Sequence, residues 1–400
     1  GADKLTGAKT RAAGAVNAYL GYFPDSPDLA LFSSPGRVEL LGNHTDHNAG
    51  AVMAGAVNID IFAVAAPSDE PVIRVKSEGY PMVTVDLRDL SPQSEESTHS
   101  PALIRGIAFR FREAGRKIGG FTAYTTSQVP KGSGLSSSAA FEVLIGTILN
   151  KMYGGRATPE QIAIDAQFAE NVYFGKPSGL MDQMACAVGN VVEIDFAEPS
   201  APAITPLSLD LAAAGCRLAV VSTGGSHADL TDCYAAIPRE MKEVAAVFRQ
   251  PVLRDITFDQ LMEKADEIRA ACGDRALLRA IHFVTENVRV RAAAAALRAG
   301  DFAAFCAELS ASGRSSVLSL QNIYPPQDLQ HQGVTLALAA ASAVLGEEGA
   351  FRVHGGGFGG TILAIVPEGR LAAFTTRMEQ LFGEGCCRIL SFREGACKIL

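Results

Sequence analysis

The sequence lacks three features that would each point to a particular class of protein. No stretch approaches the roughly 20 consecutive apolar residues that cross a bilayer, and the opening segment, GADKLTGAKT, has no apolar signal core. Lysine and arginine never gather beyond single pairs and the formal net charge is -8, so no surface for nucleic acid or anionic membrane is predicted. We therefore expect a cytoplasmic protein that binds neither.

Cysteine is present, but without a pattern that would give it a structural role. The 8 cysteines show none of the paired spacings of a zinc site, and a chain of 400 residues does not depend on disulfide bonds for its core. That length, with 48% hydrophobic residues, favours two globular domains over one oversized core. We place their boundary near 196–206, which is rich in alanine, proline and serine, and so predict domains over residues 1–200 and 201–400.

Hydrophobic periodicity predicts a mixture of strands and helices, with a sheet early in the chain. Residues 33–37 and 91–100 are polar and predict loops. Gly300 and Gly313 are expected to end the last two predicted helices. Alternation predicts strands at 38–41, 59–65, 72–75, 82–85, 121–129, 216–221 and 361–366, and helical spacing predicts helices at 8–20, 139–152, 158–170, 180–188, 285–298 and 301–309.

The strongest local signal is the stretch 130–140, PKGSGLSSSAA, which lies between a predicted strand and a predicted helix. Its glycines let the backbone turn so that successive N–H groups converge on an anion, and the following helix start adds partial positive charge. It is not a Walker loop, since no Gly-Lys-Ser/Thr closes it, nor a Gly-x-Ser-x-Gly elbow, since Ala140 follows Ser138. The stretch predicts a phosphate-binding loop, and the alternative is a serine-rich helix cap.

A polar turn over residues 42–48 follows the predicted strand at 38–41 and gathers His44, Asp46 and His47. Imidazole and carboxylate groups are ordinary zinc or iron ligands, so a metal site is one interpretation. The same groups also suit hydrogen bonding to the neighbouring hydroxyls of a polyol. A solvated turn that binds nothing is the third interpretation.

Two further segments are weak signals by themselves. Asp182 lies at the start of the predicted helix 180–188, where a carboxylate either stabilises the first turn or is aimed at a substrate hydroxyl. The glycine run 355–360 formally fits G-x-G-x-x-G, but 361–366 predicts a strand where a dinucleotide fold needs a helix. We interpret the run as a tight turn that lets the backbone approach another loop or a ligand.

Taken together and in order, four segments resemble the galactokinases of the GHMP kinase superfamily. They are PGRVELLGNHTDHN at 35–48, the loop at 131–140, GLMDQ at 179–183 and the glycine run at 355–360. The resemblance covers nearly the whole chain. It implies an α/β (α+β) protein of the two-domain GHMP kinase fold, with an N-terminal mixed-sheet domain, a C-terminal α/β sandwich domain and an active site in the cleft between them. It also implies an ATP- and Mg2+-dependent kinase that phosphorylates the C1 hydroxyl of galactose to galactose 1-phosphate.

The resemblance implies a role for each matching residue. Asp182 would face the C1 hydroxyl with Arg37 beside it, and Ser137 and Glu170 would hold Mg2+. The glycine run would close over the site and support the phosphate loop. A carboxylate near a helix start and an arginine is a weak base, so we expect Asp182 to matter as much for orienting the hydroxyl as for taking its proton. The ATP phosphates would be bound by Gly132, Ser133, Gly134, Leu135, Ser136, Ser137 and Ser138, and the sugar by Asn43, His44, Asp46, Gly179, Tyr234 and Asp182.

The chain departs from the galactokinase pattern at two positions of the polar turn. Galactokinases generally have Glu where Asn43 stands and Tyr where His47 stands. A neutral Asn43 removes a negative charge next to where the sugar C6 would lie and would accept a C6 carboxylate, so galacturonate is the alternative sugar. Whether His47 touches the sugar stays open.

Functions of two other classes are alternatives to a kinase. A metal-dependent hydrolase would use the imidazoles and the carboxylate of the polar turn as ligands. A sugar-binding regulator would keep the pocket without phosphoryl transfer, but it would have no need of Arg37, Glu170 and Asp182 together. We expect a sugar and ATP as partners, and a monomer or weak homodimer.

Overall fold

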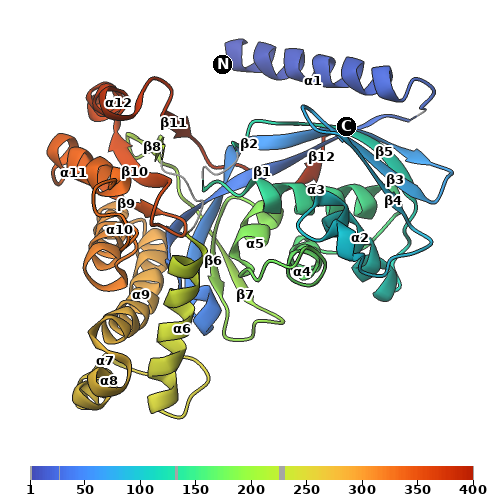
Figure 1. The fold of residues 1–400 in the computed structure, drawn as a ribbon. Coiled ribbons are helices and arrows are strands. Elements are labelled where there is room, and N and C mark those ends of the chain that lie inside the picture. The colour runs from blue at the N-terminus through green and yellow to red at the C-terminus, as the bar shows by residue number, and fades with distance from the viewer. Residues whose placement is uncertain (1, 27, 131–133, 225–229, 400) are drawn as a thin grey trace.

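The structure is a computed structural model that describes residues 2–26, 28–130, 134–224 and 230–399. The described residues form two β-sheets with helices packed around them (Figure 1). The first sheet has the strand order β12-β1-β2-β5-β3-β4, and β6 and β7 extend it beside β2. Its strands are β1 (Ala30–Leu41), β2 (Ala51–Ser68), β3 (Val72–Ser77), β4 (Met82–Asp86), β5 (Gly120–Ser127), β6 (Val191–Asp195), β7 (Ala203–Leu207) and β12 (Cys397–Lys398).

Strand β2 is the centre of the first sheet, because it pairs with β1 along one edge and with β6 and then β5 along the other. Its side chains alternate between the two faces, as the pleat of a strand requires. Ala63 and Ala65 belong to the core under the helices, whereas Phe62 and Val64 pack against α1. Helix α1 (Ala2–Tyr22) covers one face, and the other carries α2 (Ser100–Glu113), α3 (Ser137–Met152), α4 (Pro159–Phe168) and α5 (Met181–Val188).

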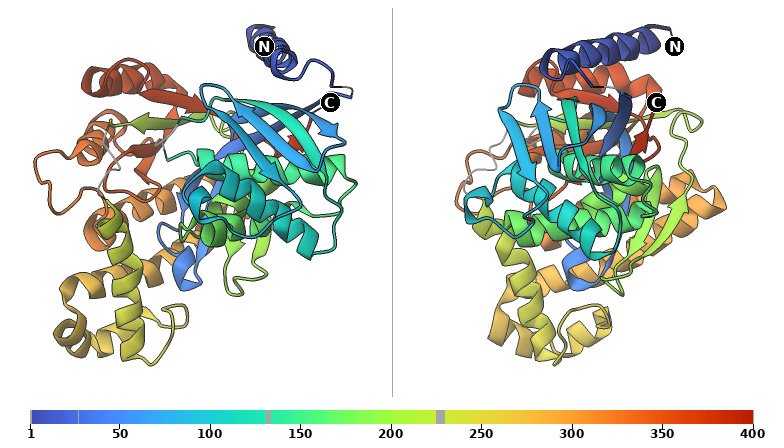
Figure 2. Two further views of the ribbon diagram at one scale, coloured as in Figure 1. Left: turned by 45° about the vertical axis from the view of Figure 1, so that its right-hand side comes forward. Right: turned by 90° about the vertical axis from the view of Figure 1, so that its right-hand side faces the viewer.

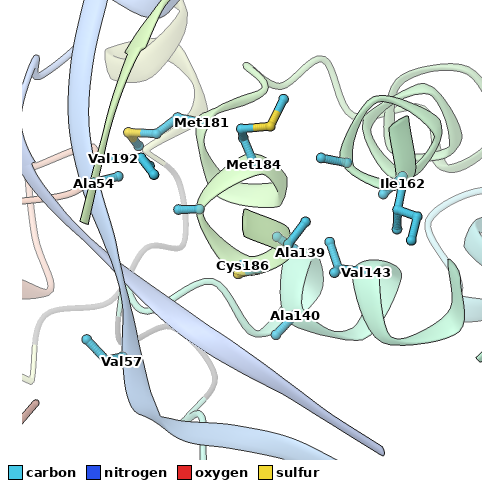
Figure 3. Close-up of a cluster of buried hydrophobic side chains, with 14 of the residues drawn as sticks. Ala54, Val57, Ala139, Ala140, Val143, Ile162, Met181, Met184, Cys186 and Val192 are labelled. Carbon is cyan, nitrogen blue, oxygen red and sulfur yellow. The ribbon is translucent and has the colours of Figure 1, made fainter. Parts of the chain in front are cut away.

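The core beneath these helices holds the site-bearing elements at fixed positions. Val143 of α3 and Met184 of α5 are fully buried in this cluster, and Ala54 and Val57 of β2 lie at its sheet side (Figure 3). Burial of such side chains contributes about 1.5–3 kcal/mol each. The start of α5 is therefore anchored against the sheet.

The second sheet is antiparallel, with the strand order β11-β8-β10-β9. Its inward residues Leu218 and Leu363 belong to the same buried cluster as the first sheet, so the two sheets share one continuous core. Helices α6 to α8 project below this sheet as a separate lobe (Figure 2). The elements are β8 (Cys216–Ser222), α6 (Thr231–Val247), α7 (Phe258–Glu263), α8 (Ala265–Cys272), α9 (Asp274–Ala299), α10 (Phe302–Ser315), α11 (Gly333–Leu345), β9 (Ala350–His354), β10 (Thr361–Pro367), α12 (Glu368–Phe382) and β11 (Cys387–Leu390).

The predicted mixed α/β fold class is confirmed, but the loop predicted at 33–37 is wrong. These residues continue β1, paired with β2 and, at Ser33, also with β12. The Ser33 hydroxyl is satisfied inside the protein, since it donates to the carboxylate of Asp60, whereas the buried hydroxyl of Ser34 has no hydrogen-bond partner among the described residues. Pro35 lacks an N–H group and lies where the register of β1 shifts, which is where a strand tolerates proline.

One of the two predicted helix ends is also wrong. Gly300 ends α9 with a φ of 72°, as expected of a C-capping glycine. Gly313 instead lies inside α10, and a Cβ there would come within 2.7 Å of the carbonyl oxygen of Phe351. The glycine is required because α10 packs closely against β9.

The domain boundary predicted near residue 200 stays a prediction. Residues 196–202 connect β6 to β7, and both strands belong to the first sheet. The first sheet also takes up β12 from the far C-terminal region. Among the described residues, no helix is long and apolar enough to cross a membrane.

Candidate active site

The site is centred on a salt bridge between β1 and the start of α5. The Nε and Nη2 atoms of Arg37 each lie 2.8 Å from Oδ1 of Asp182, and the hydroxyl of Ser136 donates to Oδ2. The Arg37 side chain is only 6% exposed, whereas that of Asp182 is 33% exposed. The structure thus brings together three of the predicted site residues and leaves the carboxylate open to an incoming group.

The described part of the predicted phosphate-binding loop packs directly against β1. The N–H of Arg37 donates to the carbonyl of Leu135 at 3.1 Å, and its guanidinium donates to the carbonyl of Gly134. Ser136 has a left-handed backbone with a φ of 58°, and α3 begins at Ser137. The predicted residues Gly132 and Ser133 lie outside the described residues.

Two carboxylates of the site have pKa values shifted in opposite directions. Burial opposes ionisation of Asp182, but the charge and hydrogen bonds of Arg37, with the hydroxyl of Ser136, hold its pKa below the ordinary value. Burial and then the neighbouring charge of Asp182 raise the pKa of Asp46 to about 6. At neutral pH Asp182 is ionised, and Asp46 titrates close to the physiological range.

The polar turn is built so that Asp46 faces the start of α5. The Thr45 hydroxyl lies 2.8 Å from the carbonyl oxygen of Gly42 and 2.7 Å from that of Ala51, so its single proton is shared between them and closes the turn between β1 and β2. Asp46 opens a short 3-10 helix, Asp46–Asn48. A Cβ on Gly179 would lie 1.7 Å from Oδ2 of Asp46, so any side chain at position 179 would displace that carboxylate. The predicted neighbours Asp46 and Gly179 are therefore in contact.

The two histidines of the turn are neutral. Burial lowers the pKa of His44 to about 4 and that of His47 to about 3. His44 Nε2 lies 2.9 Å from the carbonyl of Gly356, and His47 Nδ1 lies 2.9 Å from the amide nitrogen of Asn48. Within the described ranges, no three His, Cys, Asp or Glu side chains are grouped so that they could hold a metal ion. The turn therefore has the character of a hydrogen-bonding surface.

Asn43 is buried and belongs to a network that spans both sheets. Its amide nitrogen donates to Oε1 of Glu39 at 2.9 Å and to the carbonyl of Gly355 at 2.7 Å, and its Oδ1 accepts from Asn322 at 2.7 Å. Arg352 forms a buried salt bridge of 2.9 Å with the same Glu39 oxygen. Burial raises the pKa of Glu39 to about 7, against the opposing charge of Arg352. Glu39 therefore places a buried, paired carboxylate next to Asn43, and the expectation that Asn43 removes a negative charge from the sugar pocket stays a prediction.

The glycine run 355–360 is the tight turn that its sequence predicts, joining β9 to β10. Tyr234 of α6 donates its hydroxyl to the carbonyl of Gly357 at 3.1 Å, and burial raises its pKa to about 12. The strands that flank the turn contact the phosphate loop, since a Cβ on Gly134 would lie 2.9 Å from the Thr361 hydroxyl. The turn thus lies between the predicted sugar residues and the phosphate loop.

Glu170 lies between α4 and α5. Together with Glu142 it forms the acidic end of the site. Its carboxylate accepts from Lys176 at 2.7 Å, from Gln183 at 2.9 Å and from the hydroxyl of Ser178. The Gln183 amide also donates to Glu142 at 2.9 Å. Burial and then the charge of Glu170 raise the pKa of Glu142 well above its ordinary value. Oε1 of Glu142 and Oε1 of Gln183 are buried without a partner among the described residues.

Sequence comparison matches two segments of the chain to family models. Residues 17–67 match the family model "Galactokinase galactose-binding signature", and residues 102–190 match "GHMP kinases N terminal domain". A galactokinase of Streptomyces coelicolor (strain ATCC BAA-471 / A3(2) / M145) is 35% identical over 358 residues, which is 88% of each chain. The chain belongs to the galactokinase family.

Solved structures agree with the family assignment. A crystal structure of Lactococcus lactis galactokinase complexed with galactose superposes with a TM-score of 0.82 at 25% identity, covering 98% of this chain and 100% of that one. A crystal structure of mevalonate kinase shares the fold, with a TM-score of 0.63 at 14% identity over 92% of this chain and 99% of that one. The predicted GHMP kinase fold is therefore confirmed for this member of the galactokinase family.

Sequence reasoning missed several residues that hold the site together. Glu39, Arg352 and Asn322 support Asn43, and Gln183 links Glu170 to Glu142. One signal was available: Arg37 and Glu39 are charged residues two positions apart in an apolar strand, so they share a face that must be either exposed or paired. The partners of these residues are remote in the chain and left no local signal.

Proposed function

We propose that the chain is an ATP-dependent kinase that transfers the γ-phosphoryl group to the C1 hydroxyl of galactose. The observation that carries the proposal is the carboxylate of Asp182, partly exposed and paired with Arg37, in a chain of the galactokinase family. A hydroxyl that meets Asp182 would lie beside the phosphate loop, because Ser136 of that loop donates to the same carboxylate. Transfer of the phosphoryl group from ATP to that hydroxyl depends mainly on in-line placement of the reacting groups, because the protein itself needs to form no covalent bond.

Asp182 would orient the hydroxyl and accept its proton as the phosphoryl group is transferred. The lowered pKa of Asp182 makes it a weak base, so proton transfer would follow bond formation to phosphorus rather than precede it. Arg37 would hold the carboxylate in place and bring positive charge toward the transferred phosphoryl oxygens.

The sugar would be held by the polar turn and its neighbours. Asp46 and His44 offer an acceptor and an imidazole on one side, and Gly179 leaves room at the carboxylate of Asp46. Asn43 and Tyr234 flank the glycine turn, and Tyr234 donates to its backbone. These residues are proposed to determine which sugar binds, whereas Asp182 at the start of α5 is proposed to take part in phosphoryl transfer.

The phosphate side of the site would be formed by the loop backbone and the acidic end. Backbone N–H groups from Gly132 to Ser138, with the start of α3, would bind the ATP phosphates. Ser137 and Glu170 would hold Mg2+, for which hydroxyl and carboxylate oxygens are the suited donors. The partnerless buried oxygen of Glu142 fits a place for a cation at this end. When bound, Mg2+ supplies positive charge to the phosphate oxygens.

Product analysis of a sugar panel tests the proposal. The protein is incubated with ATP and Mg2+ and, in turn, with galactose, galacturonate, N-acetylgalactosamine, arabinose and glucose, and ADP release is recorded. We expect fastest turnover with galactose, and phosphorus NMR should identify a sugar 1-phosphate. Absence of ADP release with all five sugars would refute the kinase, whereas release with a sugar other than galactose would refute only the choice of sugar. Light scattering of the same preparation tests the proposed monomer or weak homodimer.

A further inference from the structure

One lysine is bonded twice to Glu170, the residue proposed to hold Mg2+. The Lys176 ammonium donates to Oε1 of Glu170 at 2.7 Å, and the backbone N–H of Lys176 donates to the carbonyl of Glu170 at 3.0 Å. The Glu170 side chain is only 4% exposed, whereas that of Lys176 is 57% exposed. The pair therefore joins a buried carboxylate to a cation at the surface.

The backbone brings Lys176 to this carboxylate. Glu170 lies in a π-helical turn, Ala169–Phe174, which ends at Gly175 with a left-handed φ of 84°. Turns of this kind are rare and are frequent at functional sites. A left-handed residue at the end of a helix folds the chain back on the last turn. Lys176 follows directly, so its position beside Glu170 is part of the fold rather than a chance contact of a surface side chain.

The two oxygens of the Glu170 carboxylate have different surroundings. Oε2 accepts from the buried amide of Gln183 at 2.9 Å and from the hydroxyl of Ser178. In the described part of the chain, Oε1 accepts from Lys176 alone. A cation that binds Glu170 therefore finds Oε2 held by hydrogen bonds within the fold, and it meets Lys176 at Oε1.

Two cations at one oxygen repel each other. The repulsion between an ammonium group and a divalent ion is strongest where burial limits screening by water, as it does at Glu170. The side chain of Lys176 is exposed, long and flexible, so it is the partner of Glu170 that can move away. Once displaced, the ammonium needs another negative partner, and the phosphate oxygens of a nucleotide are strong acceptors for it.

We propose that Lys176 is a tethered counter-cation of Glu170 that competes with the divalent ion: it keeps a free ion from binding tightly until a nucleotide brings its phosphates. The inference rests on the proposed function, in which Glu170 is a ligand of Mg2+. Lys176 acts through Glu170 and takes no part in the chemical step. It is a positioning residue.

The variant Lys176→Met tests this role. Methionine keeps an unbranched side chain without the charge. Mn2+ is the probe in place of Mg2+, and electron paramagnetic resonance of the free ion gives its Kd for the protein without nucleotide. We expect the Kd to fall about tenfold, the factor that corresponds to one pKa unit of charge interaction. Removal of a residue with only a structural role would not tighten ion binding.

Four further variants make the test specific. Lys176→Arg keeps a cation that can pair with Glu170 and should keep the wild-type Kd. In a Glu170→Gln background, Lys176→Met should change the Kd much less, because the carboxylate for which both cations compete is gone. Lys151→Met is the matched control, since Lys151 is an exposed lysine in the last turn of α3, at the opposite end of that helix from Ser137. If K176M does not fold, Lys176→Gln, whose amide can still donate to Glu170 without a charge, is measured instead.

The outcomes separate this inference from the proposed function. An unchanged or higher Kd for Mn2+ in folded K176M or K176Q overturns the role of Lys176, and so does an equal fall of the Kd in K151M or in the Glu170→Gln background. Mn2+ binding that stays undetectable in both the wild type and the variant overturns it too, because removal of the competitor then uncovers no ligand. A wild-type protein that releases no ADP with any sugar of the panel refutes the kinase itself, whatever the Mn2+ titrations show.

Discussion

The start of α5 and the turn after β1 each present an aspartate to the same site, yet their surroundings differ. Asp182 at the start of α5 is paired with Arg37 and Ser136, and its pKa is lowered. Asp46 in the turn is buried and close to the negative charge of Asp182, and its pKa is raised to about 6. Two identical side chains are thereby prepared for different tasks. In the proposed function, the first would stay ionised beside the reacting hydroxyl, and the second would accept hydrogen bonds from the sugar.

Replacing the aspartate of α5 should have the largest effect. Asp182→Asn keeps the shape but removes the charge that orients the hydroxyl and takes its proton, so we expect kcat to fall about 10²–10⁴-fold. The loss is measured by ADP release at saturating sugar. Asp232→Asn is the matched control, since Asp232 is an exposed first-turn aspartate of α6. If Asp182→Asn kept most of kcat, both proposed roles of Asp182 would be wrong.

Weakening the partner of that aspartate should have the next largest effect. Arg37→Lys keeps the charge but cannot place two donors on Asp182, so we expect kcat to fall about 10–100-fold. Arg298→Lys is the control, because Arg298 is half exposed and its pairing with Glu193 is a surface interaction. Equal kcat values for the two variants would show that the geometry of the Arg37 pair is unimportant.

Disturbing the turn rather than α5 should affect sugar binding. The methyl group of Gly179→Ala would displace the carboxylate of Asp46, so we expect KM for galactose to rise about tenfold, with a smaller change in kcat. Gly369→Ala in α12 is the control, since no atom lies within 4 Å of its Cβ and an alanine there should leave KM unchanged. A fall in kcat at constant KM would contradict the assignment of Asp46 to the sugar.

The smallest expected effect is a pH dependence that separates the two aspartates. As pH falls through about 6, Asp46 takes up a proton and loses acceptor strength, so the Kd for galactose should rise several-fold, at most about tenfold, between pH 7 and pH 5. Asp182 keeps its charge over this range, and His44 and His47 stay neutral because their pKa values are lowered. Calorimetric titration measures the curve. Asp46→Asn should lose the step near pH 6 and keep only the change that protonation of Glu39, with a pKa of about 7, produces. An unchanged wild-type profile in that variant would assign the titration to Glu39 rather than Asp46.

The parts of the fold that depend on local chemistry could be predicted from the sequence. The capping box of Thr158 and Gln161 was visible in the residues themselves, and both of its hydrogen bonds are present in α4. The strand at 33–37 could not be predicted, since Ser33 and Ser34 are polar but buried, and Ser33 is paired only through Asp60, which is 27 positions away. The polarity of these residues predicted an exposed loop, but pairing within the folded sheet buries them in a strand.

The residues of the candidate site also fall into two groups, those with a local sequence signal and those without one. The serine-rich loop and the polar turn were recognised because their residue types are contiguous in the sequence. Arg37 and Asp182 are 145 positions apart, and their pairing came only from resemblance to a family. The network of Glu39 and Arg352 spans 313 positions and was not predicted, because a buried charge reveals its partner only when the fold is known.

The hydrogen bond between Ser33 of β1 and Asp60 of β2 belongs to a cluster of residues that are far apart in the sequence, and this separation affects the order in which the protein folds. Asp60 of β2 binds Arg11 of α1 and Arg393, and Arg393 also donates at 2.8 Å to Ser33, which is 360 positions earlier in the chain. Contacts of such separation close late, because a long loop must first lose its freedom. During synthesis, the edge of β1 at Phe32 and Ser33 would stay unpaired until β12, at residues 397–398, has left the ribosome. A nascent chain stalled before residue 390 should therefore expose that edge to chaperones.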